Sequence, residues 1–321
     1  MQRLMVAVVS GLALAGVGTA HAQKEQYPTK SIRLIVPFAP GGGTDIVARV
    51  LAQKLSEQFR QTVVVDNRGG AGGLIGMEMA VRAQPDGYTM GFFSGSLSTN
   101  AAAGKLPFDP IKDVTPISMV AESGYVIALH PGLPIRNMKE FLVYAKANPG
   151  KLSYGSSGIG STSHLAGEQL DLLAKVQTTH VPYKSSGLAM TDMLGGQISF
   201  VYGSLPLIAP YVSGGRVRIV SITTAKRSAA LPDVPTIAES GVPGYETVTW
   251  YAVLGPRGLP KEVVARWATD MTQALQSKEL KDRAKVEGLD LSEPGPAYLL
   301  DVLKRDIPKW TQVVKAANLK L

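Results

Sequence analysis

The segment VPFAPGGGTDIVAR (residues 36–49) joins an apolar run to an amphipathic segment through a proline and three consecutive glycines. This order predicts a strand, a tight glycine loop and the N-terminus of a helix, where free backbone N–H groups form a cradle for an anion. Asp45 stands in the first turn of that helix, where its charge would repel an anion. We therefore expect Asp45 to accept hydrogen bonds from water or from the loop's own amides. The alternative is a plain helix N-terminal acid that only favours the dipole.

The segments on either side of this loop alternate between strand-like and helix-like patterns. Residues 31–38 read as a strand, and the following helix places Ile46, Val47, Val50, Leu51, Leu55 and Phe59 on one face. Further strands are expected at 62–67, 88–94, 152–154, 178–183, 198–204 and 216–224, and helices at 73–82, 137–149, 161–175, 186–194, 205–213, 260–276 and from about 296. The alternation predicts an α/β fold with mostly parallel sheets.

Two extended apolar runs, at 118–131 and 246–256, are long for single strands. We interpret them as strands that cross between two domains. This places domain one at residues 23–124 plus 250–321 and domain two at residues 125–249. Two crossings close together would form a hinge, because a few dihedral angles can then swing one lobe against the other.

A second glycine loop, GSSGIGSTS (residues 155–163), follows the strand at 152–154 and precedes another helix, with Ser161 or Thr162 as its N-cap. Each loop presents amides at the positive end of a helix dipole. Open α/β sheets bind ligands at the C-terminal ends of their strands. The pair of loops therefore predicts a clamp that grips a carboxylate from two sides.

Several aromatic and hydroxyl residues lie just past the ends of expected strands and could line the same cleft. They are Phe38, Ser94, Ser96, Ser156, Ser157, Tyr183, Tyr202 and Ser204. Ordinary packing or turn chemistry explains each of them equally well. Lys184 would add a positive charge to the cleft, although a solvated lysine is the simpler interpretation.

Nucleotide, catalytic and metal motifs are incomplete. PGGGTD lacks the Lys-Ser/Thr of a Walker A loop, and both GIGSTS and RGGAGGLIG (68–76) miss the dinucleotide spacing. We interpret residues 68–76 as a flexible connection whose small residues let a helix and a strand approach each other. There is no cysteine and no G-x-S-x-G motif. His164 and Glu168 lack a third metal ligand, which favours a packing or capping histidine.

The N-terminus predicts export. Arg3, an apolar stretch over residues 4–17 and Ala20-His21-Ala22 form a secretory signal peptide over residues 1–22, with cleavage after Ala22 into the periplasm. The absence of cysteine excludes a lipid anchor and disulfides. The sequence pI is about 9.5, but Lys and Arg are scattered and form no basic run. A soluble surface with a mild positive bias is therefore favoured over a nucleic-acid-binding one.

The mature chain resembles the extracytoplasmic solute receptors of tripartite tricarboxylate transporters, the Bug or TctC-type proteins. The resemblance covers nearly all of it and is carried by YPTKSIRLIVPFAPGGGTDIVAR, VVVDNRGGAGGLIG, AQPDGYTM, LSYGSSGIGSTSHLAGEQL, HVPYKSSGLAMTDMLGGQISF, LPDVPTIAESGVPGYE and WYAVLGPRGLPKEVV. It implies a two-lobed, type II-like Venus-flytrap binding fold whose cleft closes on a small carboxylate. Main-chain amides and ordered waters hold that carboxylate in the family. The corresponding residues here are Pro40, Gly41, Gly42, Gly43, Thr44, Asp45, Gly158, Gly160, Ser161 and Thr162.

Gly43 departs from the family pattern, since many relatives have a bulkier residue there, and we expect it to loosen or widen the loop. The resemblance predicts a monomeric periplasmic receptor for a di-, tri- or aromatic carboxylate, without cofactor, metal or nucleic acid. Its partners would be two integral membrane transporter subunits. A ligand-presenting sensor for a membrane signalling receptor is the alternative, and a neighbouring permease or sensor-kinase gene would discriminate the two. A secreted enzyme acting on small acids is disfavoured by the missing nucleophile and base.

Overall fold

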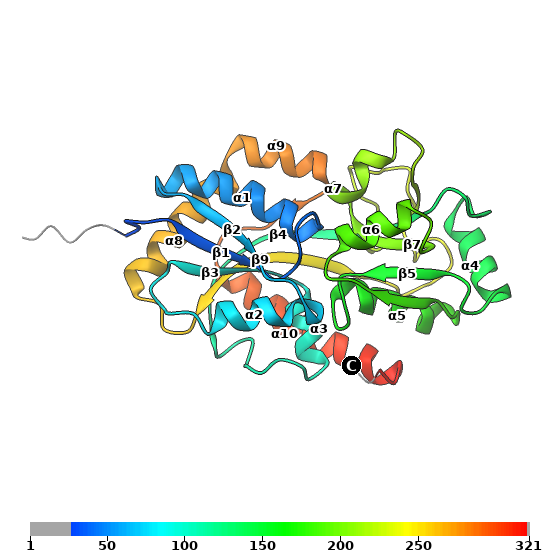
Figure 1. Cartoon of the computed structure of the whole chain (residues 1–321), viewed down its shortest axis with the longest axis horizontal. Helices are drawn as coiled ribbons and strands as arrows, with labels where there is room; N and C mark the ends of the chain where they lie inside the picture. The colour runs from blue at the N-terminus through cyan, green and yellow to red at the C-terminus, as the bar shows by residue number, and fades with distance from the viewer. Residues whose placement is uncertain (1–26, 320–321) are drawn as a thin grey trace, which may run out of the picture.

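The computed structural model describes residues 27–319, so the signal peptide expected over residues 1–22 lies outside the described part. Residues 27–319 form two lobes (Figure 1). Two long strands run between them, β4 (Val114–Leu129) and β9 (Val248–Pro256). Within the described residues, no helix has the length and apolarity needed to cross a membrane.

Lobe 1 is built on three parallel strands that continue into β9 and β4. They are β1 (Ile32–Val36), β2 (Val63–Asn67) and β3 (Thr89–Ser94). β1 lies between β2 and β3, so that Leu34 pairs with Val65 on one side and Met90 on the other. β3 then pairs antiparallel with β9. Because all three strands point the same way, the loops that follow them emerge at one edge, which faces the second lobe.

Helices cover both faces of this sheet, which is why its strands are almost continuously apolar. One face packs against α1 (Gly43–Phe59) and α8 (Lys261–Gln276), with Leu51 and Trp267 fully buried between them. The other face packs against α2 (Leu74–Val81), α3 (Ser96–Ala102) and α10 (Pro296–Ala316).

Lobe 2 repeats this arrangement on a smaller scale. Its strands are β5 (Ser153–Ser156), β6 (Thr179–Pro182), β7 (Phe200–Ser204) and β8 (Arg218–Ile222). The helices α4 (Met138–Ala147) and α5 (Thr162–Ala174) cover one face, and α6 (Ser186–Leu194) and α7 (Leu205–Ile208) cover the other. Short 3-10 turns at Ala71–Gly73 and Ala209–Tyr211 complete the connections.

The strand β4 belongs to both lobes. It pairs with β9 over residues 114–124, and with β7 and β8 over residues 125–129. The sheet is therefore continuous, with the strand order β2-β1-β3-β9-β4-β7-β5-β6. Its outer strands are parallel, but β4 and β9 run antiparallel to their neighbours, so the expectation of mostly parallel sheets holds only away from the hinge.

Local sequence signals set most helix boundaries. The Asn137 side chain accepts a hydrogen bond from the Glu140 amide at 2.9 Å, and Ser161 Oγ accepts one from the His164 amide at 3.3 Å, as expected for N-caps.

Three elements of the structure were not predicted from the sequence. They are α3, α9 (Lys278–Glu287) and the short β10 (Asp290–Leu291). α9 has only Leu280 and Ala284 buried, too few to make a visible apolar stripe. A helix was predicted over residues 205–213, but the α-helix observed there, α7, ends at Ile208.

The C-terminal helix α10 contacts both lobes. Its N-terminal half buries Leu299 and Leu303 against lobe 1, while Trp310 and Val313 pack against Leu165 of α5 in lobe 2. Figure 1 shows the last turns of this helix extending beneath the second lobe. The lobes are thus joined by two strands and by one packed helix.

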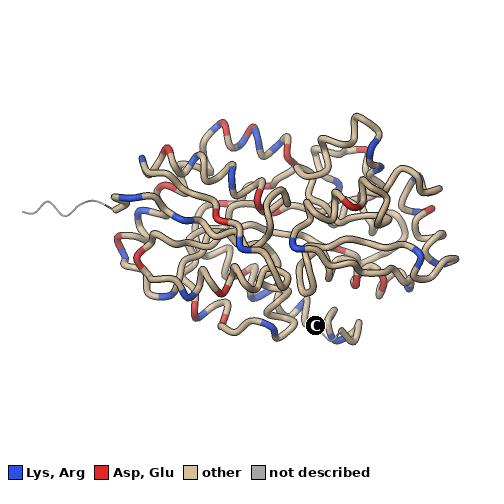
Figure 2. Tube along the Cα trace, viewed as in Figure 1, with Lys and Arg blue, Asp and Glu red and all other residues tan. Residues whose placement is uncertain are grey.

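Charged residues are mixed over both lobes. Figure 2 shows basic and acidic positions interspersed along the outer helices, without one face reserved for a single sign. This distribution agrees with the scattered Lys and Arg residues of the sequence. It is typical of a solvated surface and unlike a nucleic-acid-binding face.

The packing of α10 on α5 leads to a stability prediction. Trp310 is 2 % exposed, so Trp310→Ala should lower the free energy of unfolding by about 3–5 kcal/mol through lost burial and a residual cavity. Urea unfolding followed by circular dichroism measures this change. Val143, on the outside of α4, is 70 % exposed, and Val143→Ala is the control with an expected change of less than about 0.5 kcal/mol. Equal effects from both variants would contradict the bridging role of α10.

Candidate functional site

The first glycine loop connects the end of β1 to α1 at the edge of lobe 1 that faces lobe 2. Gly41 has a φ of +82°, a conformation that side-chain-bearing residues rarely adopt, and it turns the chain so that α1 begins at Gly43. The Gly41 amide donates to Asp45 Oδ2 at 2.9 Å. Asp45 therefore accepts a hydrogen bond from its own loop, which fixes the shape of the turn.

Asp45 is 3 % exposed and has no free charge to present to a ligand. Arg49 Nε and Asn67 Nδ2 donate to its carboxylate at 3.0 and 2.9 Å. Burial alone would raise the pKa of Asp45, but the hydrogen bonds from Arg49, Gly41 and Asn67 outweigh it and hold the pKa below its ordinary value. The acid that seemed to oppose an anion is thus neutralised within lobe 1.

The second glycine loop connects β5 to α5. Gly158 and Gly160 have φ values of +115° and +86°, which the loop needs to reverse direction twice before Ser161 caps the helix. Most of its amides have partners inside lobe 2. The Gly158 amide donates to Ser156 Oγ, the Gly160 amide to His164 Nδ1 and the Ser157 amide to Ser163 Oγ.

Each loop contacts the opposite lobe, and the first-turn amides of α1 and α5 cross the junction between the lobes. The Gly43 amide donates to Ser186 Oγ of α6 at 3.4 Å, and the Thr162 amide donates to Ser96 Oγ of α3 at 3.3 Å. Each helix N-terminus therefore ends on a neutral hydroxyl of the opposite lobe. Both bonds are long for their type, whereas the Thr99 hydroxyl donates to the Gly160 carbonyl at 2.6 Å.

Lobe 1 contributes a third loop, residues 68–73, that the sequence analysis read only as a flexible connection. Gly72 sits against the Ile159 carbonyl of lobe 2, so closely that a Cβ there would clash with it. Asn100 Nδ2 donates to the Gly72 carbonyl at 3.1 Å. The small residues do permit a close approach, but the approach is between the two lobes as well as within lobe 1. The contact of this loop with lobe 2 could have been predicted from the sequence, because the loop follows β2 and therefore emerges at the same edge of the sheet as PGGGTD.

Hydroxyl groups of the crossing strands lie beneath the loops. Tyr125 pairs with Ser204 in the β4–β7 register, and Tyr251 of β9 pairs with Ser94 of β3. Burial raises the pKa of Tyr125 to about 12, opposed only in part by the neighbouring Thr249 and Thr162 side chains. These buried groups stay uncharged at neutral pH.

Two of the buried hydroxyls in this region, Ser204 Oγ and Thr249 Oγ1, make no hydrogen bond of normal geometry in the described part of the chain, although the side chains of Tyr251 and Tyr125 lie near them. A Cβ on Gly43 would clash with Ser204 Oγ, which explains in this chain why the smallest residue occupies position 43. Buried hydroxyls without partners are costly and are typical of sites that receive a polar ligand.

Most of the residues selected from the sequence lie at this junction. Phe38 is buried beside Gly73, Gly42 lies against Ser186, and Ser94, Ser96, Ser161 and Thr162 are all at most 3 % exposed. Pro40 and Gly41 are exposed, and Thr44 is half-buried in the first turn of α1. Lys184 is exposed, and its carbonyl accepts a hydrogen bond from the Ala39 amide at 3.1 Å.

Three of the selected residues lie away from the contact between the loops. The Tyr183 hydroxyl donates to Asp192 within lobe 2. Tyr202 packs against Tyr154 and Phe200 in the core, two residues deeper along β7 than Ser204. Ser156 lies beneath its own loop, where its Oγ binds the Gly158 amide. Conversely, Tyr125, Thr249 and Tyr251 were missed, because hydroxyls within apolar strands resemble ordinary core residues. Asn100 was missed because helix α3, which carries it, was not predicted.

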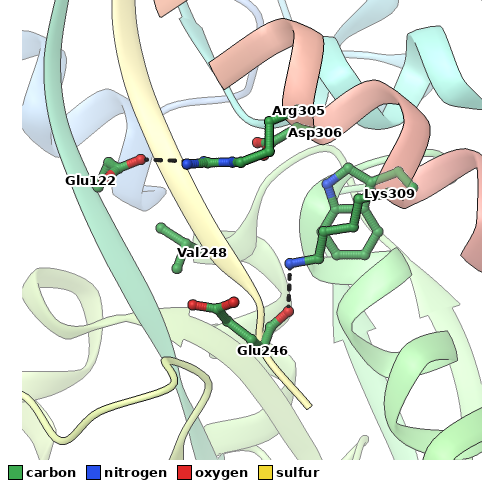
Figure 3. A pocket seen from close by; sticks show the side chains of 7 residues that line it. Glu122, Glu246, Val248, Arg305, Asp306 and Lys309 are labelled. Atoms are coloured by element: carbon green, nitrogen blue, oxygen red, sulfur yellow. Dashed lines mark hydrogen bonds and ion pairs between the residues drawn. The ribbon is translucent and has the colours of Figure 1, made fainter. Parts of the chain in front are cut away.

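A polar cavity of about 270 Å³ lies behind the hinge, away from the glycine loops. Figure 3 shows Arg305 directed towards Glu122, and Lys309 donating to the Glu246 carbonyl at 2.9 Å. Burial lowers the pKa of Lys309, although nearby Glu246 and Asp306 oppose this effect. Arg305 and Lys309 already have partners, which makes this cavity a weaker carboxylate site than the loop junction.

Among residues 27–319, no cluster of three or more His, Cys, Asp or Glu side chains could hold a metal ion.

The Asp45 network generates a pH-dependent prediction. Because its pKa is lower in the folded chain, ionised Asp45 contributes stability that is fully present above the unfolded value of about 3.9 and is lost as the pH falls through the folded value. Asp45→Asn should therefore be less stable than the wild type at pH 7, by on the order of 1–2 kcal/mol. The gap should begin to narrow below about pH 3.9 and should be lost only as the pH falls through the lower, folded value. Urea unfolding at pH 7, 5, 3.5 and 2.5 measures it, with the exposed Asp301→Asn as control. A gap independent of pH would contradict this account.

Comparison with known proteins shows the family of this chain. Residues 47–319 match the model of the tripartite tricarboxylate transporter family receptor, TctC, a match that begins just after the first glycine loop. Protein BugT of Bordetella pertussis is 33 % identical over 324 residues, covering 100 % of this chain and 99 % of that protein. Among solved structures, Rhodopseudomonas palustris Rpa4515 with adipate is 34 % identical with a TM-score of 0.87, covering 91 % of this chain and 99 % of that one. MatC of the same organism, with bound malate, is 29 % identical with a TM-score of 0.85, covering 90 % of this chain and 100 % of that one. The chain therefore belongs to the TctC family of tripartite tricarboxylate transporter receptors.

Proposed function

We propose that this protein is a periplasmic receptor that captures a small organic carboxylate between its lobes and delivers it to a tripartite tricarboxylate-type membrane transporter. The observation that carries the proposal is the pair of first-turn amides, Gly43 and Thr162, each of which donates to a serine hydroxyl of the opposite lobe. The adipate and malate held by the two Rhodopseudomonas palustris relatives support a carboxylate as the ligand class.

The chemistry of the junction supports this ligand class. A carboxylate between the lobes would replace two long bonds to neutral hydroxyls by charge-assisted bonds, which are shorter and stronger. It would also supply acceptors for the unpartnered hydroxyls of Ser204 and Thr249. A ligand that contacts both lobes shifts the equilibrium from open to closed, because it binds the closed state better. We place the ligand contacts at Phe38, Gly42, Gly43, Ser94, Ser96, Thr162, Ser204 and Thr249.

We further propose the boundaries and partners of the receptor. Lobe 1 comprises residues 23–124 plus 250–321, and lobe 2 comprises residues 125–249, with cleavage of the signal peptide after Ala22. The closed receptor acts as a monomer and docks on two integral membrane subunits. It turns over no substrate, so its ligand should be recovered unchanged after incubation.

Carboxylates should raise the melting temperature of the unliganded mature protein. At about a hundred times its Kd, a ligand that binds only the folded state adds roughly 2.7 kcal/mol to the free energy of unfolding. A thermal-shift screen of mono-, di-, tricarboxylic and aromatic acids measures this effect, with sugars and peptides as controls. Stabilisation by a sugar or peptide and by no acid would contradict the proposal.

Position 43 tests the location of the site. A methyl group on Gly43 would clash with Ser204 across the junction, although the residue itself has an ordinary helical backbone. Gly43→Ala should weaken binding of the acid found in the screen by about 5- to 150-fold, the range expected of overpacking by 1–3 kcal/mol. Gly195→Ala is the matched control, because a Cβ there meets only ordinary contacts. Equal affinity of both variants, measured by calorimetry, would place the site elsewhere.

A further inference from the structure

Two stacked histidines lie directly beneath the lobe-2 glycine loop. The rings of His164 on α5 and His180 on β6 are 3.9 Å apart between centroids, with an interplanar angle of 25°. His164 is 4 % exposed. The ligand-binding proposal gives neither residue a role, and from the sequence a packing or capping role was favoured for His164 over that of a metal ligand.

Each ring is connected to an amide of the loop. The Gly160 amide donates to His164 Nδ1 at 3.2 Å. His180 Nε2 lies 2.6 Å from Ser156 Oγ, which in turn accepts from the Gly158 amide at 3.0 Å. The two positive-φ glycines of the loop are therefore both held, directly or through one hydroxyl, by the histidine pair.

The contact at His164 is one half of a reciprocal cap. Ser161 Oγ accepts the His164 amide, while the His164 side chain reaches back to accept the amide that precedes the cap. In the capping-box motif a Glu or Gln at this position supplies a similar returning acceptor, for the amide of the cap residue itself. An imidazole differs from these, because it accepts at Nδ1 only while that nitrogen carries no proton.

The surrounding groups fix the protonation chemistry. His164 Nε2 lies 3.5 Å from Glu168 Oε1, which also accepts from the Tyr154 hydroxyl at 3.2 Å. With Nδ1 accepting, the proton of neutral His164 resides on Nε2, and any second proton must go to Nδ1. That proton would point at the Gly160 N–H group and abolish the bond.

Burial and the neighbouring charged groups shift the pKa of His180 in opposite directions. Burial, followed by the neighbouring His164, lowers the pKa of His180 to about 4, while Glu168 opposes this. Asp171, farther along α5, is held by Thr178, and burial raises its pKa to about 6. Lys105 of lobe 1 also lies near Gly160, with its Cδ among the atoms that a Cβ there would meet. Two stacked imidazolium rings at 3.9 Å would repel each other, so the pair takes up one proton before the other.

We propose that the His164–His180 pair positions the lobe-2 glycine loop by holding its amides, and that protonation of the pair releases the loop and weakens carboxylate binding. His164 is a positioning residue, since its acceptor faces Gly160 and does not face the junction. The binding part of this proposal rests on the function proposed above, whereas the loop part does not.

The Gly160 amide can be observed alone by NMR. The sequence contains two Ile–Gly pairs, Ile75–Gly76 and Ile159–Gly160, so carbonyl-¹³C isoleucine combined with ¹⁵N glycine selects two resonances. Gly76 packs against Pro37 in lobe 1 and serves as the internal reference. In the ligand-free mature protein, the Gly160 resonance should titrate between pH 8 and pH 4 while Gly76 does not move.

Two variants separate the acceptor from the ring. His164→Asn keeps an acceptor near Nδ1 that cannot titrate, so its Gly160 resonance should stay at the wild-type pH 8 position throughout. His164→Phe keeps the stacked ring without the acceptor, so its Gly160 resonance should be displaced at pH 8 and insensitive to pH. A wild-type Gly160 resonance that does not respond to pH would overturn the proposal. So would a His164→Asn titration identical to that of the wild type, or loss of both resonances together through acid unfolding.

Binding is measured with malate and adipate as probes at pH 7.5 and pH 5.5. His164→Phe should bind on the order of tenfold more weakly than the wild type at pH 7.5, the effect expected when a buried amide loses its acceptor. Between pH 7.5 and 5.5, the wild type should lose more affinity than His164→Asn, a comparison in which ionisation of the acid cancels. Equal losses would overturn the coupling. If the wild type binds neither malate nor adipate, these two acids are not its ligands, and the Gly160 titration still decides the positioning role.

Discussion

The amides in the first turn of a helix have no acceptor inside that helix, and the junction of the two lobes is organised around this constraint. α1 and α5 point these amides at each other's lobe, and Gly43 and Thr162 use them on serine hydroxyls across the gap. β1 runs parallel to β3, and β5 runs parallel to β7. The loops that follow β1 and β5 place the N-termini of α1 and α5 at the junction of the lobes. Two helix N-termini are placed at this junction. This placement accounts for the glycines in the loops and for the buried hydroxyls beneath them.

The electrostatic design of the junction uses dipoles in place of charged side chains. Asp45 is bonded to Arg49, Gly41 and Asn67, so lobe 1 presents amides and no net carboxylate charge. Hydroxyls of Ser96 and Ser186 accept from the helix amides in the ligand-free structure and can donate to an anion instead. The helix amides therefore keep acceptors when the ligand leaves, which suits a receptor that must release its ligand after delivery. An arginine clamp would bind more tightly and release more slowly.

Local chemistry made the loops, caps and strand ends predictable. Ser161 and Asn137 were recognisable as N-caps by residue type, and the glycines of both loops by their place between an apolar run and a helix. What could not be predicted depends on how the lobes meet. Tyr125 and Thr249 resemble core residues until the hinge brings β4 against β7 and β9, and Tyr202 differs from Ser204 only by its depth along one strand. α9 was missed because its helicity rests on capping by Ser277 and on surface ion pairs.

The central claim is that the helix N-termini of the two lobes hold the ligand carboxylate. A crystal structure of the mature protein with the acid that most raises its melting temperature tests this claim most directly. The account predicts carboxylate oxygens within about 3 Å of the Gly43 and Thr162 amides, at hydrogen-bonding distance. An acid bound instead beside Arg305 and Lys309 in the hinge cavity, with the two amides still on Ser186 and Ser96, would contradict it.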